Sequence, residues 1–466
     1  MFPKASAAHT GNVLDRLRQM LQASRDDWQD TSPDHLFSFN LEVDEAHLRP
    51  SLDQTEDEFY WYRPVDHLVV AGVGRAAEYS AIGAERFSRL DAAHRALAGD
   101  WTQLGSVPAC GPLAVVGFAF DPADEPGPEW GGLKNSMMAV PSVLFRRSGD
   151  RAALNFSATG SALADVDAQL ETWADQLARF RRPQSSPRPV LNGQMLEQIS
   201  ENDTWRRRVE QALSAIHSGR LDKVVLTRRV RFRSQRVLDC AQVMDFLDQR
   251  HDACAHFAIA KGGRTLLGVS PERLLALHEG TVTVDALAGT TPRGQNPGHD
   301  SRLAEALMTD PKVCEEHRLV VDEIRSALTP VCSDLNFPQQ PKIMPLPQVQ
   351  HLWTPVTGKV KNGEGLLAIA RRLHPTPAVG GSPRQAAAKW LADSGEPGRG
   401  WYTGACGWID ARGNGELSVI LRCGLVSGRT ADLFAGAGIV ADSRPEQELA
   451  ETEWKLLTML GALRLG

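Results

Sequence analysis

The C-terminal part of the sequence carries two acidic residues and a lysine at spacings of three and four. Glu448, Glu451 and Lys455 therefore share one face of the helix that we expect over residues 445–463. Such a face is either a solvated ladder of ion pairs or half of a site for a hard metal ion. The spacing alone favours the ladder.

A second acidic position supplies the partner that a metal site would need. Glu316 lies early in a helix expected over residues 311–328, and His317 follows it. Mg²⁺ prefers oxygen ligands and keeps several waters, so carboxylates from two distant helices are typical of its sites. We therefore consider a magnesium site between the two helices, with His317 as a packing or supporting residue rather than a ligand.

Two further residues have the types needed for acid–base chemistry. Lys223 begins an otherwise apolar strand, where a lysine either points to solvent at a sheet edge or faces inward and acts as a general base. Glu272 could be the matching acid, because burial raises the pKa of a carboxyl group and lets it hold a proton near neutrality. An ion pair with the adjacent Arg273 is the alternative for Glu272.

Glycine-rich segments occur at residues 288–294 (AGTTPRG) and 435–439 (AGAGI). Neither matches a Walker loop or the G-x-G-x-x-G fingerprint of dinucleotide-binding proteins. Backbone N–H groups of the second segment could hold an anion beside the metal. Its glycines could equally allow two strands to pass closely, and both interpretations stay open.

Composition excludes several classes of protein. The chain has 466 residues and a formal net charge of −6, with 42% hydrophobic and 23% charged residues. These values are typical of a globular protein, and the acidic balance argues against a general nucleic-acid binder. The apolar runs are far shorter than the ~20 residues of a membrane helix, and the N-terminus lacks the pattern of a secretory signal. We therefore expect a cytoplasmic protein with no membrane or nucleic-acid partner.

The order of the elements indicates an α+β fold. Strand patterns recur through the second half of the chain, at residues 223–232, 255–260, 265–269, 282–287, 402–409, 417–426 and 433–440. They suggest a large, mainly antiparallel sheet system, because the helices between them are too irregular for a βαβ repeat. Asn414-Gly415 predicts a hairpin turn with positive φ at both positions. A stretch rich in Pro and Ser at residues 181–189 predicts a linker or surface crossing.

Read in order, these segments resemble the catalytic region of the chorismate-utilising enzymes, which include isochorismate, salicylate, anthranilate and aminodeoxychorismate synthases. The resemblance rests on nine motifs in the family's order: KVVLTR, SPERLL, LAGTTPRG, EEHRLVVDEI, QHLWTPVTG, LHPTPAVGG, GRGWYTGACGW, ELSVILR and AGAGIVADSRPEQELAETEWK. They cover about residues 200–466, whereas residues 1–200 resemble the family only loosely.

The resemblance implies a single monomeric body of two facing, mainly antiparallel β-sheets with helices packed outside. Residues 201–466 would be the chorismate-binding catalytic region, and residues 1–200 would complete the sheets without a catalytic motif. Lys223 would be the base that activates water, and Glu272 the acid that protonates a departing hydroxyl. The implied cofactor is Mg²⁺. Its implied ligands are Glu316, Glu448 and Glu451, and the implied substrate-binding residues are Thr290, His351, Tyr402, Arg422, Gly436, Gly438 and Lys455.

Two positions discriminate among the activities of this family. Lys223 stands where ammonia-using members carry Gln, and Ala288 stands where aminodeoxychorismate synthases carry a nucleophilic Lys. Both indicate a member that uses water and needs no glutaminase partner. Val313 departs from the pattern, because several relatives carry an acidic or polar residue there.

The resemblance therefore implies an isomerase that converts chorismate to isochorismate, for menaquinone or salicylate-derived siderophore synthesis. A salicylate synthase, which goes on to eliminate pyruvate in the same site, shares these residues and is the alternative. A non-catalytic chorismate-binding protein would be expected to lack Lys223 or a metal carboxylate, and the sequence has them all.

Overall fold

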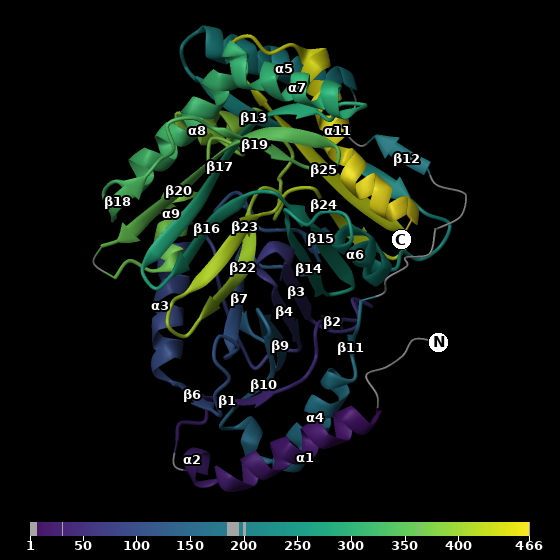
Figure 1. The fold of residues 1–466 in the computed structure, drawn as a ribbon, viewed down its shortest axis with the longest axis vertical. Coiled ribbons are helices and arrows are strands. Elements are labelled where there is room, and N and C mark those ends of the chain that lie inside the picture. The colour runs from purple at the N-terminus through teal and green to yellow at the C-terminus, as the bar shows by residue number, and fades with distance from the viewer. Residues whose placement is uncertain (1–6, 30, 184–194, 199–201, 362, 466) are drawn as a thin grey trace.

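Two large β-sheets lie face to face, and helices cover their outer surfaces (Figure 1). The computed structural model describes residues 7–29, 31–183, 195–198, 202–361 and 363–465. Residues 184–189 of the expected linker lie outside the described residues. The expected α+β fold of two facing, mainly antiparallel sheets is confirmed.

The first sheet has 13 strands and runs through both halves of the chain. Its order is β12 (Met195–Gln198), β13 (Lys223–Arg233), β25 (Thr430–Ile439), β24 (Cys423–Ser427), β15 (Arg264–Ser270), β14 (Ala255–Lys261), β3 (Glu58–Arg63), β4 (Leu68–Val73), β9 (Val143–Ser148), β10 (Arg151–Thr159), β1 (Leu36–Glu42) and β6 (Trp101–Leu104). Strand β21 (Gly381–Ser382) pairs with the start of β13. The β1–β6 pairing is parallel, and the other pairings described in this sheet are antiparallel.

The second sheet has 10 strands and is also shared between the two halves. Its order is β18 (Cys332–Asn336), β20 (Val349–Val360), β17 (Thr281–Pro292), β16 (Arg273–His278), β23 (Gly415–Val419), β22 (Ala405–Asp410), β7 (Leu113–Phe118), β8 (Ser136–Val140) and β5 (Ala77–Ala81), with β19 (Lys342–Pro345) beside β20. A separate two-stranded pair joins β2 (Arg49–Pro50) to β11 (Phe180–Arg181).

Alternation of side chains along the strands produces the layers. In β3, Phe59 and Trp61 face the second sheet and pack with residues such as Trp408, while Tyr60 faces the opposite side. The interior layer is therefore apolar, and each sheet has a second apolar face that helices must cover.

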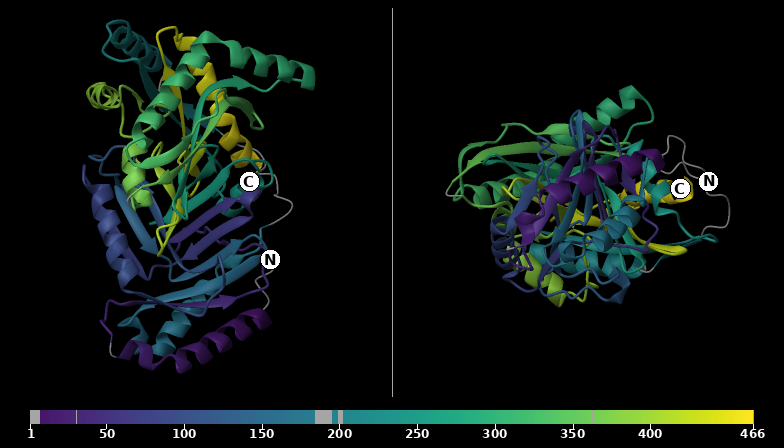
Figure 2. Two further views of the ribbon diagram at one scale, coloured as in Figure 1. Left: turned by 60° about the vertical axis from the view of Figure 1, so that its left-hand side comes forward. Right: turned by 90° about the horizontal axis from the view of Figure 1, so that it is seen from below.

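Helices cover the two outer faces separately. The first sheet packs against α1 (Ala7–Ala23), α4 (Val166–Leu177), α6 (Cys240–Asp248) and α11 (Pro445–Leu465). The second sheet packs against α3 (Arg86–Gly99), α8 (Pro311–Leu328) and α9 (Leu366–Leu373). Figure 2 shows α1 running beneath the N-terminal strands.

The remaining helices lie at the ends of the sheets or in connections. Helices α5 (Asn202–His217) and α10 (Arg384–Asp393) share an apolar cluster with β13 and β25. Helix α7 (Pro297–Thr309) precedes α8, and α2 (Asp26–Gln29) is a single short turn. Three 3₁₀ segments occur in the described residues: η1 (Pro64–Asp66), η2 (Pro128–Trp130) and η3 (Ala162–Ala164). Among the described helices, none has the length and apolar character to cross a membrane.

The expected hairpin exists, but its turn is not formed by Asn414 and Gly415. Ile409 pairs with Gly415, and the positive φ of 84° belongs to Gly413. The Asp410 carboxylate accepts hydrogen bonds from the backbone N–H groups of Arg412 and Asn414, each at 2.9 Å. This side-chain cap favours a longer loop than a two-residue turn.

The strand expected over residues 417–426 is divided into two. Strand β23 ends at Val419 in the second sheet, and β24 begins at Cys423 in the first. Arg422 lies at the crossing with a φ of 46°, a left-handed conformation that interrupts the strand. The apolar pattern continued through the crossing, so sequence alone did not reveal it.

Candidate active site

The expected site residues converge on one cavity between the two sheets, beside α8 and α11. The cavity is lined by these members of the expected set: Glu272, Thr290, Glu316, His351, Tyr402, Arg422, Gly436, Gly438, Glu451 and Lys455. Lys223 and Glu448 are not part of this lining. Lys223 is bonded to Glu316, and Glu448 is bonded to Lys312. Residues more than 200 positions apart in the chain therefore meet at one place.

Lys223 faces the interior, so the solvent-exposed alternative is wrong. Its side chain is fully buried, because β21 and β25 flank the first residues of β13. The Lys223 ammonium donates to Glu316 Oε1 with Nζ 2.8 Å away. The lysine is thus held at the cavity wall by a carboxylate of α8.

Glu272 is buried in the turn between β15 and β16, with 4% of its surface exposed. Its expected alternative, an ion pair with Arg273, is wrong, because Arg273 instead donates to Glu416 at 3.0 Å. Burial and the field of Asp285 raise the pKa of Glu272 to about 8, against the opposing effects of Lys223 and a hydrogen bond with Thr376. This carboxyl group therefore holds a proton at neutral pH.

Each of the three carboxylates expected to bind metal is paired with a lysine. Glu316 pairs with Lys223 as described. Glu448 accepts from Lys312 Nζ at 2.7 Å, and Glu451 accepts from Lys455 Nζ at 2.5 Å. On α11 the Glu451–Lys455 ion pair of the expected ladder is present, but both side chains line the cavity instead of standing in solvent, and Glu448 turns toward α8.

These three carboxylates have the chemistry of a hard-metal site. Lys312 contacts Glu448 and also lies within electrostatic range of Glu316 and Glu451. Burial and the nearby Glu451 raise the pKa of Glu448, which is the response expected of crowded carboxylates. As the side chains stand, the described residues contain no group of three acidic, His or Cys side chains arranged as metal ligands. Three carboxylates are the kind of oxygen donors that a divalent cation such as Mg²⁺ prefers.

His317 serves α8 as a structural residue. It is buried, its Nε2 lies 2.8 Å from Thr354 Oγ1, and its Nδ1 lies 3.3 Å from the Ala288 carbonyl. Val313, on the same helix, faces the left-handed residue Gly289, where an added Cβ would lie 2.4 Å from Val313 Cγ1. Gly289 is also the site of a register shift in β17, which sets the direction of Thr290 into the cavity.

Arg422, His351 and Thr290 form a connected group on one wall. Arg422 donates to His351 Nε2 at 3.2 Å, and His351 Nδ1 lies 3.0 Å from Thr290 Oγ1. An arginine can only donate, so His351 carries its proton on Nδ1 and is neutral. Burial, followed by the charge of Arg422, holds the pKa of His351 well below its usual value. The guanidinium is left with donors for a substrate carboxylate.

Gly436 and Gly438 of β25 form another part of the cavity wall, and their lack of side chains lets neighbouring groups lie close to this strand. A Cβ at Gly438 would lie 2.6 Å from Glu316 Oε1 and 2.8 Å from Lys223 Cε. At Gly436 it would lie 2.9 Å from the Leu226 carbonyl and 3.4 Å from the Tyr402 hydroxyl. The strand-crossing interpretation of these glycines is therefore correct, and it explains how the Lys223–Glu316 pair fits against β25.

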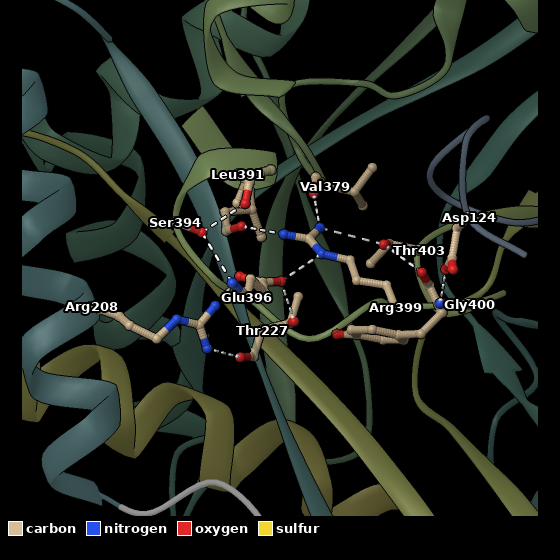
Figure 3. Close-up of polar contacts among 12 residues, drawn as sticks. Asp124, Arg208, Thr227, Val379, Leu391, Ser394, Glu396, Arg399, Gly400 and Thr403 are labelled. Atoms are coloured by element: carbon tan, nitrogen blue, oxygen red, sulfur yellow. Dashed lines mark hydrogen bonds and ion pairs between the residues drawn. The ribbon is translucent and has the colours of Figure 1, made fainter. Parts of the chain in front are cut away.

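A buried ion-pair network, shown in Figure 3, is bonded to the backbone of two residues that line the cavity. Glu396 lies between Arg208 and Arg399, and it accepts from Thr227 Oγ1 at 2.5 Å. Arg399 also donates to the carbonyl groups of Val379 at 2.8 Å and Val225 at 2.6 Å. Both valines line the cavity. The network thus fixes the backbone of both residues.

Sequence reasoning missed Lys312 and this network. Lys312 precedes Glu316 by four residues, a spacing that places both on one face of α8 and was available as a signal. Glu396 and Arg399 lie in a Gly- and Pro-containing stretch with no periodic pattern, so only the structure shows that their side chains are buried.

The cavity is small in this arrangement. Its volume is about 60 Å³, well below the ~300 Å³ at which ligand pockets usually begin. The paired side chains of Lys223, Lys455 and their glutamates fill the space between α8, α11 and β25. A ring-shaped substrate therefore requires these pairs to separate.

The chain is similar in sequence and structure to known proteins. A sequence profile described as "Chorismate binding enzyme" matches residues 19–464. An isochorismate synthase of Bacillus subtilis is 32% identical over 421 residues, which is 88% of each chain. The salicylate biosynthesis isochorismate synthase of Pseudomonas aeruginosa is 34% identical over 406 residues, covering 87% of this chain and 84% of that protein. The menaquinone-specific isochorismate synthase of Escherichia coli has a similar structure, with a TM-score of 0.76 and 25% identity over 96% of this chain and 99% of that one.

Proposed function

Because this chain belongs to the family of chorismate-binding enzymes, we propose that it is an isochorismate synthase, an isomerase that converts chorismate to isochorismate. The observation that carries the proposal is that a buried lysine, Lys223, and a buried, protonated Glu272 are both found at this cavity, Glu272 in its lining and Lys223 bonded to Glu316 of the lining. A base for water and an acid for a departing hydroxyl are what this isomerisation needs.

We infer the following sequence of bond changes. Lys223, as the neutral amine, takes a proton from water, and the water oxygen bonds to C2 of chorismate. The ring double bonds shift, the bond from C4 to its hydroxyl breaks, and Glu272 supplies the proton that lets this hydroxyl leave as water. One water enters and one leaves, so the product is an isomer of the substrate.

Substrate binding is assigned to the cations and donors of the cavity. Chorismate is a dianion, so a chain with a net charge of −6 must attract it through local positive charge. Arg422 and Lys455 supply that charge, Tyr402 offers a hydroxyl group, and Thr290 with His351 lines the wall. The backbone at Gly436 and Gly438 lets the substrate approach β25 without a side chain in the way.

We propose Glu316, Glu448 and Glu451 as the residues that hold Mg²⁺. A bound Mg²⁺ would neutralise a substrate carboxylate and polarise it. Lys312 and Lys455 balance Glu448 and Glu451 in its absence.

Other features of the proposal concern the protein as a whole. A water-using enzyme needs no ammonia, so we propose that it works without a glutaminase subunit. We also propose that residues 1–200 complete the sheets of the catalytic region rather than act alone. A monomeric state and a cytoplasmic location stay predictions, for size-exclusion chromatography with light scattering and for cell fractionation.

The test of this function is product analysis. Purified protein is incubated with chorismate and MgCl₂, and the products are separated by liquid chromatography. We expect isochorismate in equilibrium with remaining chorismate, and no release of pyruvate. Salicylate and pyruvate in equal amounts as the main products would identify a salicylate synthase instead. Unchanged chorismate under all conditions would contradict any catalytic role.

A further inference from the structure

A second cavity lies at the opposite end of the molecule from the candidate active site. It has a volume of about 450 Å³ and opens between the two sheets, under the loop of residues 105–112. Figure 1 shows strands β1, β6, β9 and β10 at the end away from α8 and β13. The two cavities have no lining residue in common. This volume is within the range of sites for small organic ligands.

Arg146 of β9 is the central charge of this cavity. Arg146 is 8% exposed, and its guanidinium lies 4.8 Å from the centre of the Trp408 ring in the facing sheet. NH1 donates to the Gly111 carbonyl at 3.0 Å, while Nε is buried without a hydrogen-bond partner. Within the described part of the chain, no carboxylate lies within 4.0 Å of this guanidinium. A buried cation without a counter-charge is costly, so a ligand that pairs with it would be favoured.

The acidic residue in the lining of this cavity does not fill that role. Asp410 lines the same cavity and acts on Arg146 through its field. Its carboxylate oxygens already accept from the backbone N–H groups of Arg412 and Asn414 and from the Asn414 side chain at 3.2 Å. Arg412 itself is mostly exposed, with 79% of its side chain accessible, and stands at the edge of the cavity. Arg146 therefore remains the buried donor.

A second unpartnered group defines the ligand further. Asn40 of β1 lines the cavity, is 6% exposed, and has an Oδ1 atom without a hydrogen-bond partner. It can accept a hydrogen bond from a hydroxyl or ammonium group. Val107, Pro108, Pro112 and Ala411 add apolar surface to the lining, beside the polar side chains of Gln103 and Ser106. The site thus offers a carboxylate anchor, an apolar patch and one acceptor.

We propose that this cavity binds a small organic carboxylate that carries a hydrogen-bond donor on an apolar body. The ligand's carboxylate pairs with Arg146 through the guanidinium nitrogens that the protein leaves without partners. Its hydroxyl or ammonium group donates to Asn40. The ring or chain between the carboxylate and the donor group of the ligand lies against the loop of residues 105–112. The site is separate from that of the proposed isomerisation and does not depend on it.

The test uses 3-hydroxybenzoate as the probe, with binding measured by isothermal titration calorimetry on the full-length protein. The candidate active site also attracts carboxylates, so Arg422→Gln is the background that removes that contribution. We expect the probe to bind Arg422→Gln protein, and at least about tenfold weaker binding when Arg146→Gln is added, since hydrogen bonds to charged groups are strong. The neutral 3-hydroxybenzamide should bind at least about tenfold more weakly than the acid.

Asn40→Ala gives a second and independent measurement. It should weaken binding of 3-hydroxybenzoate severalfold and leave unsubstituted benzoate unaffected, because benzoate has no donor for Asn40. This comparison keeps the proposal testable if Arg146→Gln does not fold. Retained turnover of chorismate by Arg146→Gln would show that it does fold.

Several outcomes would overturn the proposal. They are the absence of saturable binding in Arg422→Gln protein, equal binding of acid and amide, and unchanged affinity in Arg146→Gln. Inorganic phosphate lacks an apolar body and should displace the probe poorly. Displacement by phosphate at equal concentration would indicate a general anion site and also contradict the proposal.

Discussion

The ammonium group of Lys223 donates a hydrogen bond to Glu316, with Nζ 2.8 Å from Oε1. The proposed base for water is therefore bonded to a proposed metal ligand. Lys223 can take a proton from water only when its nitrogen is free of this contact. Turnover consequently requires Glu316 to give up the contact, which couples the acid–base residue to whatever cation the carboxylates hold.

Removing the base should abolish turnover while binding remains. For Lys223→Ala we expect kcat to fall by about 10² to 10⁴, the usual contribution of a general base, with chorismate affinity changed only severalfold. Isothermal titration with chorismate and a product assay measure the two quantities. Lys389→Ala, on the exposed face of α10, is the matched control. Near-normal turnover by Lys223→Ala would remove this residue from the role of base.

The protonation of Glu272 should appear in the pH profile. The acid is active when protonated, so its titration should make kcat/KM fall as the pH rises through about 8, the pKa raised by burial. Glu272→Gln keeps the shape of the side chain but has no proton to donate. The residual kcat/KM of this variant should therefore not fall as the pH rises through about 8. A wild-type profile that stays flat to pH 9.5 would contradict the assignment of Glu272 as the acid.

The same carboxyl group should reduce stability as the pH rises. Its pKa is raised above the ordinary 4.5 to about 8, so folding takes up a proton between these values and the protein loses about 1.4 kcal/mol per pH unit from this group. Glu272→Gln does not titrate. Its free energy of unfolding, measured with urea, should exceed that of the wild type by an amount that grows from pH 5 to pH 8. A constant difference would show that Glu272 titrates normally.

Lys312 should compete with a divalent cation for Glu448. Lys312→Met leaves this buried carboxylate unpaired, so we expect a lower Tm in EDTA, because breaking a buried pair costs about 3–5 kcal/mol. MgCl₂ should raise the Tm of this variant more than that of the wild type, since no ammonium has to be displaced. Lys389→Met is the control. Equal Tm shifts in both proteins would argue against a cation site beside Lys312.

The acidic ligands should set the magnesium requirement. Glu451→Gln should shift the Mg²⁺ concentration for half-maximal activity upward at least about tenfold, because it removes one charged ligand. Glu453→Gln, two residues further along α11 and mostly exposed, should leave that concentration unchanged. Full wild-type activity in EDTA would refute the metal assignment.

The ion-pair network of Glu396 should matter for both folding and affinity. Glu396→Ala leaves Arg208 and Arg399 buried without their carboxylate, and we expect a loss of about 3–5 kcal/mol in unfolding free energy. Because Arg399 fixes the carbonyls of Val225 and Val379, KM should rise more than kcat falls. Glu305→Ala on the exposed side of α7 is the control. An unchanged KM in folded Glu396→Ala protein would limit this network to stability.

The motifs of the sequence predicted the fold class and most of the cavity, because their residues have fixed places in a family with one architecture. They did not predict the contacts that depend on rotamers. Packing between elements far apart in the chain decides these contacts. It turns Glu448 toward Lys312, and it pairs Arg273 with Glu416 instead of Glu272. The crossing at Arg422 was hidden because apolar residues continue on both sides of it.

The three lysine–glutamate pairs leave this part of the cavity electrically balanced, with three positive and three negative groups. A lone Mg²⁺ would give it an excess of two positive charges, and a lone chorismate dianion an excess of two negative ones. Arriving together, they cancel, and neither leaves an uncompensated charge in a buried space. Affinity for each is therefore expected to rise in the presence of the other, by the same factor in both directions.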